Sequence, residues 1–248
     1  MNSDFSFIKH KDVEVLVYLP WWRKGIVHGT TTSLLSFDRS RVESSARLLQ
    51  HAFQFSRLIL PLQVHGAELA DLRSAERLDR CLAQNGIVAR AGECDGLLAP
   101  CVSEARHSSL AFGVLSADCV PVIVRSRDSW GLIHAGWRGL ANGVIEKAIR
   151  AMNGVTEGVV FPCAGGERYE VGSEVIKAIG GTAVYTAAGD ASGRFYLDTA
   201  GTAIKQLRIS MPGIHAVSSG ICSISDERFH SHRRAGQTAG RSITFVCV

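Results

Sequence analysis

Three short segments of this 248-residue chain carry side chains that can bind a transition metal. Cys119 lies in the motif ADCVP, His134 begins the motif HAGWRG, and His65 lies upstream in QVHG. One thiolate and two imidazoles suit zinc, and three protein ligands leave a fourth position of the ion free for chemistry. These residue types make the chain a candidate enzyme with a metal centre.

A predicted β-hairpin brings two of the three side chains together. Residues 120–124 and 130–134 are apolar, and about five polar residues join them, a length that suits a hairpin loop. A turn centred on residues 126–127 would place Cys119 roughly opposite His134, at the cross-strand separation of about 5 Å. The third side chain, His65, ends a different predicted strand and would have to approach from a neighbouring loop.

The same side chains fit other chemistry. A metal-free cysteine hydrolase would use Cys119 as its nucleophile and His134 as the base. A copper-dependent phenol oxidase would need several clustered histidines, whereas the nine histidines here are scattered. A purely structural zinc site would need a fourth ligand, for which His28 and Cys163 are the candidates. Cys119 and His134 also fit ordinary roles in a protein core.

Two charged residues flank the candidate ligands. Asp118, next to the cysteine, is a candidate acid or base, or alternatively the carboxylate that orients a ligating histidine. Arg138 stands in a glycine-rich turn that opens a predicted helix, where it could bind phosphate or form a structural salt bridge. Three arginines near the C-terminus are expected to support the fold: Arg233, Arg234 and Arg241.

Composition narrows the classes of function. The net charge is only +4, which gives no case for a nucleic-acid-binding protein but would favour an anionic substrate. The seven cysteines form no CxxC pair, which is typical of reduced thiols and favours a cytoplasmic location. No secretory signal is evident, and no apolar run reaches the roughly 20 residues that cross a bilayer.

Strand-like and helix-like segments alternate through the chain. Residues 13–19 and 58–64 read as strands, and residues 41–55 and 140–152 carry apolar side chains at helical spacing. No sequence repeat, low-complexity tract or long linker divides the chain. The pattern predicts one domain that mixes strands and helices.

The motifs QVHG, ADCVPV and HAGWRG, in this order, resemble those of the YfiH-type family, also called the multicopper polyphenol oxidase or laccase-domain family. The likeness continues in CDGL from Cys94, in YEVG from Tyr169 and in HRR from His232. It spans about residues 26–248. Residues 1–25 are then expected to form an N-terminal strand and loop of the same domain.

The resemblance implies a single-domain α+β fold with four layers, α-β-β-α, and mixed sheets. It implies a mononuclear zinc site held by His65, Cys119 and His134, with copper as the alternative metal. The implied activity is phosphorolysis of adenosine, inosine, guanosine and methylthioadenosine, with adenosine deamination beside it. The expected partners are therefore a purine nucleoside and phosphate.

Two segments depart from the family pattern. Family members usually have an arginine in the segment that here reads GTTT, residues 29–32. Where they have Gly-Pro, this chain has Phe161 before its proline, and the region around Gly165 is altered too. Both segments are expected to line the pocket, so the departures bear on substrate choice.

Overall fold

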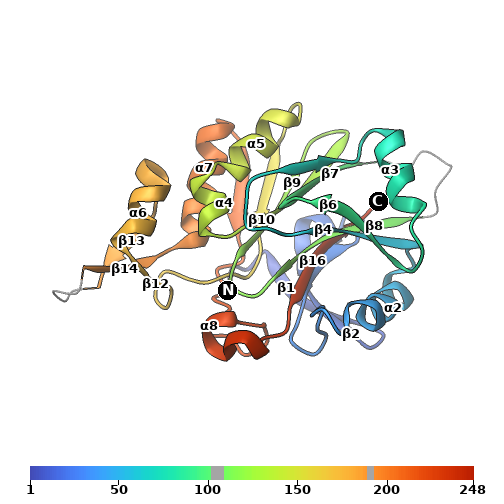
Figure 1. The fold of residues 1–248 in the computed structure, drawn as a ribbon, viewed down its shortest axis with the longest axis horizontal. Helices are drawn as coiled ribbons and strands as arrows, with labels where there is room; N and C mark the ends of the chain where they lie inside the picture. The colour runs from blue at the N-terminus through green and yellow to red at the C-terminus, as the bar shows by residue number, and fades with distance from the viewer. Residues whose placement is uncertain (102–108, 189–192) are drawn as a thin grey trace.

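The computed structural model describes residues 1–101, 109–188 and 193–248. Two large β-sheets pack face to face, and helices cover the outer face of each sheet (Figure 1). The layers therefore run helix, sheet, sheet, helix. This arrangement confirms the single-domain α+β fold with four layers that the family resemblance implies.

The first sheet has seven strands in the order β1-β2-β3-β16-β8-β4-β6. Their bounds are β1 Phe5–His10, β2 Val13–Tyr18, β3 His28–Thr31, β4 Arg57–Leu62, β6 Val88–Glu93, β8 Leu110–Ser116 and β16 Ser242–Cys247. Strand β4 runs parallel to both of its neighbours, β8 and β6, whereas β16 is antiparallel to β8. The sheet is therefore mixed, and β4 delivers the chain to His65 three residues beyond its end.

The second sheet has six strands in the order β15-β11-β9-β10-β7-β5. Their bounds are β5 Leu69–Asp71, β7 Gly96–Pro100, β9 Val120–Arg125, β10 Ser129–Ala135, β11 Glu157–Val160 and β15 His215–Ser218. Parallel pairs at both edges flank the antiparallel β9–β10 hairpin, so this sheet is mixed as well. Cys119 directly precedes β9 and His134 lies near the end of β10, so both stand at the open end of the hairpin.

Helices lie on the two outer faces and at one end of the molecule. Their bounds are α1 Leu19–Trp22, α2 Val42–Phe53, α3 Ala75–Leu82, α4 Trp137–Ala141, α5 Val144–Ala151, α6 Ser173–Ile179, α7 Thr199–Ser210 and α8 His232–Ala235. A small sheet of β12 Glu170–Gly172, β14 Arg194–Leu197 and β13 Tyr185–Ala187 lies with α6 at the end of the ribbon (Figure 1). None of the helices in these three stretches has the length and apolar character needed to cross a bilayer.

Alternation along the strands builds the layers. On β9, Val122 and Val124 face the layer of α5 and α7, whereas Ile123 between them faces the other sheet. On β4, Leu58 and Leu60 likewise face α2, and Ile59 faces the layer between the sheets. Because successive strand residues point to opposite faces, each strand contributes to two cores at once. Both sheets are thus buried on both faces.

The N-terminal segment contains more structure than the sequence predicts. A strand in residues 13–19 is present as β2, but the expectation of a single strand before residue 26 was wrong. Phe5 to His10 form a second strand, which pairs with β2 across a turn at Lys11, where φ is 51°. The apolar residues of β1 are only Phe5, Phe7 and Ile8, and the strand ends in the polar Lys9 and His10, so its signal in sequence is short and weak.

The predicted register of the β9–β10 hairpin was also wrong. Trp130 pairs with Arg125 and His134 pairs with Pro121, so the turn is centred between residues 127 and 128. The hydroxyl of Ser126 donates to Asp128, and the N–H of Ser126 donates to the carbonyl of Ser129 at 2.9 Å. These polar contacts make a tight two-residue turn and lengthen both strands. Cys119 therefore lies beyond the end of the ladder and not opposite His134.

Candidate metal centre

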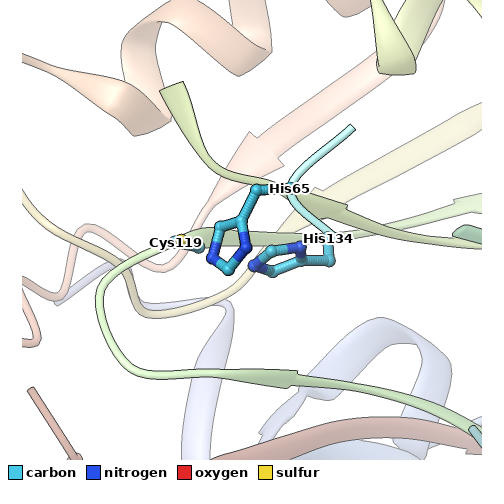
Figure 2. A group of neighbouring side chains, drawn as sticks. All are labelled: His65, Cys119 and His134. Atoms are coloured by element: carbon cyan, nitrogen blue, oxygen red, sulfur yellow. The ribbon is translucent and has the colours of Figure 1, made fainter. Parts of the chain in front are cut away.

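His65, Cys119 and His134 converge in spite of the shifted register. One ligand atom from each side chain lies within 4.8 Å of the other two. Figure 2 shows the two imidazole rings and Cys119 gathered around one point, with the ring centroids of His65 and His134 5.0 Å apart. His134 is buried, Cys119 is half-buried and His65 is exposed. The three side chains thus form a group that is open to solvent on the His65 side.

Two left-handed residues bend the chain into this group. His65 has φ of 60° and Asp118 has φ of 92°. Such conformations cost on the order of 1–3 kcal/mol each in residues other than glycine, so the surrounding structure must hold them. In return they turn the chain just beyond β4 and just before β9. Backbone strain therefore aims both His65 and Cys119 at His134.

The carboxylate of Asp95 holds the centre together. It is fully buried just before β7. It accepts hydrogen bonds from His134 Nδ1 at 2.9 Å, from the N–H of His65 at 2.9 Å and from the N–H of Gly66 at 2.6 Å. Since Nδ1 of His134 donates to Asp95, its Nε2 is free to bind a metal. One carboxylate thus orients a ligand and fixes the loop of another.

Asp95 is the functional residue that sequence reasoning missed. In the sequence Asp95 stands out only within the CDGL motif of the family resemblance, and Asp118 is the carboxylate expected, as an alternative role, to orient a histidine. That orienting role belongs to Asp95. The sequence signal for this role is a carboxylate directly before the apolar strand Gly96–Pro100. A carboxylate in that position is expected to be buried, and a buried charge requires hydrogen-bond partners.

The electrostatics of the group favour charge separation. Burial opposes the thiolate, but the His134 and His65 imidazoles outweigh it and lower the pKa of Cys119 to about 6. Burial likewise opposes the imidazolium, yet the Cys119 thiolate and Asp95 raise the pKa of His134 to about 9. Burial raises the pKa of Asp95, but His134 and the loop N–H groups bring it below its ordinary value. In the absence of metal, these pKa values favour a thiolate beside an imidazolium near neutral pH.

Asp118 supports the loop that carries Cys119. One of its oxygens accepts from the hydroxyl of Ser223 at 2.7 Å, and the other accepts from the N–H of Arg233 at 2.7 Å. These bonds hold the left-handed backbone of Asp118 in place. Each oxygen keeps a second lone pair, so the contacts leave room for proton transfer. The acid or base role of Asp118 stays a prediction.

The arginines differ in their surroundings. Arg138 is exposed, and its guanidinium lies over the ring of Trp137, 4.4 Å from the centroid. Arg234 donates to the carbonyls of Ser223, Ile224 and Phe229, as a fold-supporting residue does. Arg241 donates to two carbonyls of its own loop and also lines a cavity beside the ligands. Phosphate binding by Arg138 stays a prediction.

Two cavities adjoin the candidate ligands. The larger measures about 520 Å³ and is lined by His65, Cys119 and His134 together with apolar residues such as Val64. The smaller measures about 100 Å³ and also reaches Cys119. Ligand pockets for small organic molecules measure roughly 300–1,000 Å³. The larger cavity falls in that range, and the ligand group opens directly into it.

Neither candidate fourth ligand joins the group. His28 is buried in the core, where its Nε2 accepts from the N–H of Tyr18 and burial lowers its pKa to about 4. Cys163 is buried beside Thr199, and burial raises its pKa to about 12. Within residues 1–101, 109–188 and 193–248, the group that could bind a metal consists of three side chains. A three-ligand site is what an open, catalytic metal requires.

The segments that depart from the family pattern lie away from the ligands. Thr30 is hydrogen-bonded to Thr244 within the seven-stranded sheet, and Phe161 packs against Phe5 between the sheets. The expectation that these side chains line the pocket was wrong, because both are buried in the core. Cys163 and Gly165 line a separate cavity of about 650 Å³.

Comparison with known proteins agrees with this geometry. The family model described as multi-copper polyphenol oxidoreductase laccase matches residues 31–248. The chain belongs to this laccase-domain family. A crystal structure of YlmD from Geobacillus stearothermophilus superposes with a TM-score of 0.78 at 25% identity, covering 97% of both chains. A crystal structure of a YfiH protein from Bacillus licheniformis has a TM-score of 0.79 at 19% identity, covers 99% of both chains and shows the shared fold.

Sequence relatives in the laccase-domain family carry names of enzymes. A protein of Xylella fastidiosa named purine nucleoside phosphorylase is 36% identical over 149 residues, which are 54% of this chain and 55% of that protein. The match thus spans about half of that relative's length. YlmD of Geobacillus stearothermophilus, named a purine nucleoside phosphorylase too, is 27% identical over 226 residues, covering 84% of this chain and 79% of its own.

Loss of the Asp95 charge is expected to weaken metal binding. Asp95→Asn keeps the size of the side chain but removes the carboxylate that orients His134. We expect the zinc affinity to fall about 10- to 100-fold, the usual effect of losing a residue behind a metal ligand. Competition with a chromophoric chelator measures it. Asp71→Asn, at a partly exposed carboxylate paired with Arg73, is the matched control and should leave the affinity unchanged.

Metal affinity is also expected to depend on pH in two steps. Binding requires the Cys119 thiolate and a neutral His134, so it displaces protons. Below about pH 6 both groups carry a proton, and between about 6 and 9 only His134 does. The contribution of these two groups should therefore make the logarithm of the metal affinity rise with pH, with a slope of about two below pH 6 and about one between pH 6 and 9. Chelator competition across pH 5–10 tests this, and a flat profile contradicts it.

Proposed function

We propose that this protein is a purine nucleoside phosphorylase with one zinc ion held by His65, Cys119 and His134. The observation that carries the proposal is that the ligand group opens into a cavity of about 520 Å³. The names of the sequence relatives support the same activity. The proposed substrates are adenosine, inosine, guanosine and methylthioadenosine with phosphate. Adenosine deamination is proposed as a side activity, in the cytoplasm.

The donor set fits zinc. A thiolate and two imidazoles in a half-buried group are typical zinc ligands, and Asp95 supplies the carboxylate that commonly holds such a histidine. When bound, zinc would supply Lewis-acid stabilisation of negative charge. The family description also names copper. Multicopper sites need more clustered histidines than the one His-Cys-His group found in the described residues.

Phosphorolysis exchanges one bond at the sugar for another. The bond between C1′ and the purine nitrogen breaks, and its electron pair leaves with the base, which takes up a proton. An oxygen of phosphate forms the new bond to C1′, so the products are free purine and the 1-phosphate of the nucleoside's sugar. The residues at the site must therefore bind two partners side by side and provide a proton. Asp118 lines the smaller cavity and is the proposed proton donor.

Base release is the direct test. Zinc-loaded protein incubated with each of the four nucleosides should release free purine only when phosphate is present. Cys119→Ala and His65→Ala should lower the rate by more than about 100-fold, because a ligand matters more than the residue behind it. Cys81→Ala, at a buried thiol away from the site, is the matched control. Equal release without phosphate would show a hydrolase, and no release from any nucleoside would overturn the proposal.

The role of Asp118 has its own test. Asp118→Asn retains acceptance at one oxygen, so the loop should keep its shape and the protein its zinc. If Asp118 transfers the proton, the turnover rate should fall by about 10²- to 10⁴-fold and one limb of the pH–rate profile should vanish. An unchanged pH profile at reduced rate would instead assign Asp118 to positioning Cys119.

A metal-free cysteine hydrolase is the second candidate function. The lowered pKa of Cys119, the raised pKa of His134 and the carboxylate of Asp95 behind the imidazole match an activated nucleophile. Metal analysis separates the two candidates. About one zinc per chain in protein purified without added metal supports the phosphorylase. Metal-free protein whose Cys119 is alkylated rapidly at pH 7 supports the hydrolase.

A further inference from the structure

The smaller cavity differs from the larger one in its chemistry. It measures about 100 Å³, and its walls include Tyr169, Trp137 and Arg233. Cys119 and His232 line both cavities, so the two spaces are neighbours beside the candidate metal centre. A volume of this size is below the range for organic ligands but suits a small ion.

Arg233 gives this cavity a fixed positive charge. It lies in α8, and its N–H donates to a carboxylate oxygen of Asp118, the residue that precedes Cys119. Its guanidinium lies over the ring of Tyr169, 4.7 Å from the centroid. The backbone bond fixes the main chain of Arg233, and the ring contact places its guanidinium beside the candidate ligands.

The guanidinium of Arg233 is available to a ligand. Arg233 is exposed and lines the cavity, so its side chain stands at the mouth. None of the salt bridges in the described residues involves it. The nearby carboxylate of Asp118 accepts from the backbone N–H of Arg233 and from Ser223, and it forms no ion pair with the guanidinium of Arg233. A planar guanidinium without a carboxylate partner is well suited to bidentate binding of phosphate.

The other arginines near the centre are less suited. One guanidinium nitrogen of Arg241 already donates to the carbonyls of Ala239 and Gly240. Arg90 donates to the carbonyl of Pro61, and burial lowers its pKa. Both line the larger cavity, where the half-exposed side chains of Leu62 and Val64 offer an apolar wall. That wall fits the flat face of a purine better than it fits an ion.

We propose that the cavity beside Arg233 is an anion subsite that binds orthophosphate, while the nucleoside occupies the larger cavity. The inference rests on the proposed function for the identity of the second ligand. Because Cys119 and His232 line both spaces, a phosphate oxygen and the sugar would meet at their junction. Arg233, with Tyr169 beneath it, is the specificity-determining residue for phosphate.

Phosphate binding tests the subsite without any turnover. Isothermal titration of zinc-loaded protein with orthophosphate should show binding to the wild type. Arg233→Gln should weaken the affinity about tenfold or more, because a charge-assisted pair is lost. The phosphate affinity of Arg233→Lys should lie between those of the wild type and Arg233→Gln. Arg150→Gln, which removes an exposed charge paired with Glu146 on α5, is the matched control and should bind like the wild type.

Kinetics then connects the subsite to the reaction. Arg233→Gln should raise the KM for phosphate about tenfold or more and leave the KM for inosine and the zinc content unchanged. The substitution removes only the side chain, and the bond to Asp118 comes from the backbone, so the unfolding midpoint should stay near that of the wild type.

The inference would be overturned if the wild type did not bind phosphate, or if Arg233→Gln bound it normally. It would also be overturned if phosphate affinity fell in Arg241→Gln or Arg138→Gln but not in Arg233→Gln. Failure of the proposed function looks different. Phosphate would bind through Arg233 as expected, but no nucleoside would be cleaved, and the anion subsite would then serve another phosphate-dependent reaction.

Discussion

The buried carboxylate of Asp95 is the contact on which the site depends. It binds the ring of His134 from one side and the backbone of His65 and Gly66 from the other. His134 belongs to the six-stranded sheet, whereas the loop of His65 and Gly66 follows a strand of the seven-stranded sheet. A buried charge is costly unless it is fully paired. Its pairing therefore locks the two sheets into the one arrangement in which His65 reaches the other ligands.

Cys119 completes the group through a separate set of contacts. Asp118 is held in a left-handed conformation by Ser223 and by the N–H of Arg233, both of which come from the C-terminal part of the chain. The loop of Cys119 is thus fixed by segments more than one hundred residues away. The same contacts set Arg233 beside the candidate ligands, so the proposed metal site and the proposed anion site share one support. The sheets provide rigidity, and short loops at their ends provide the chemistry.

Much of the fold and of the candidate site was predictable from sequence. Apolar periodicity marks α2 and α5, and alternation marks the central strands, because burial of one face requires those periods. Residue type alone selects His65, Cys119 and His134 as candidate metal ligands, because a thiolate is a soft ligand and an imidazole is one of intermediate softness. The order of the motifs indicates the family. These features can be predicted because each depends only on residue types and on their spacing along the chain.

Other features depend on contacts that no local pattern encodes. The hairpin register follows from side-chain bonds of Ser126 and Asp128 in the turn, which shift the pairing although the apolar runs stay the same. The role of Asp95 appears only when two sheets bring His134 and the loop of His65 to one carboxylate. The different surroundings of Arg138 and Arg233 likewise depend on where α4 and α8 pack. Residue types and their order along the chain specify which groups could react. Which of these groups meet depends on long-range packing and strand pairing, because only those contacts bring distant segments together.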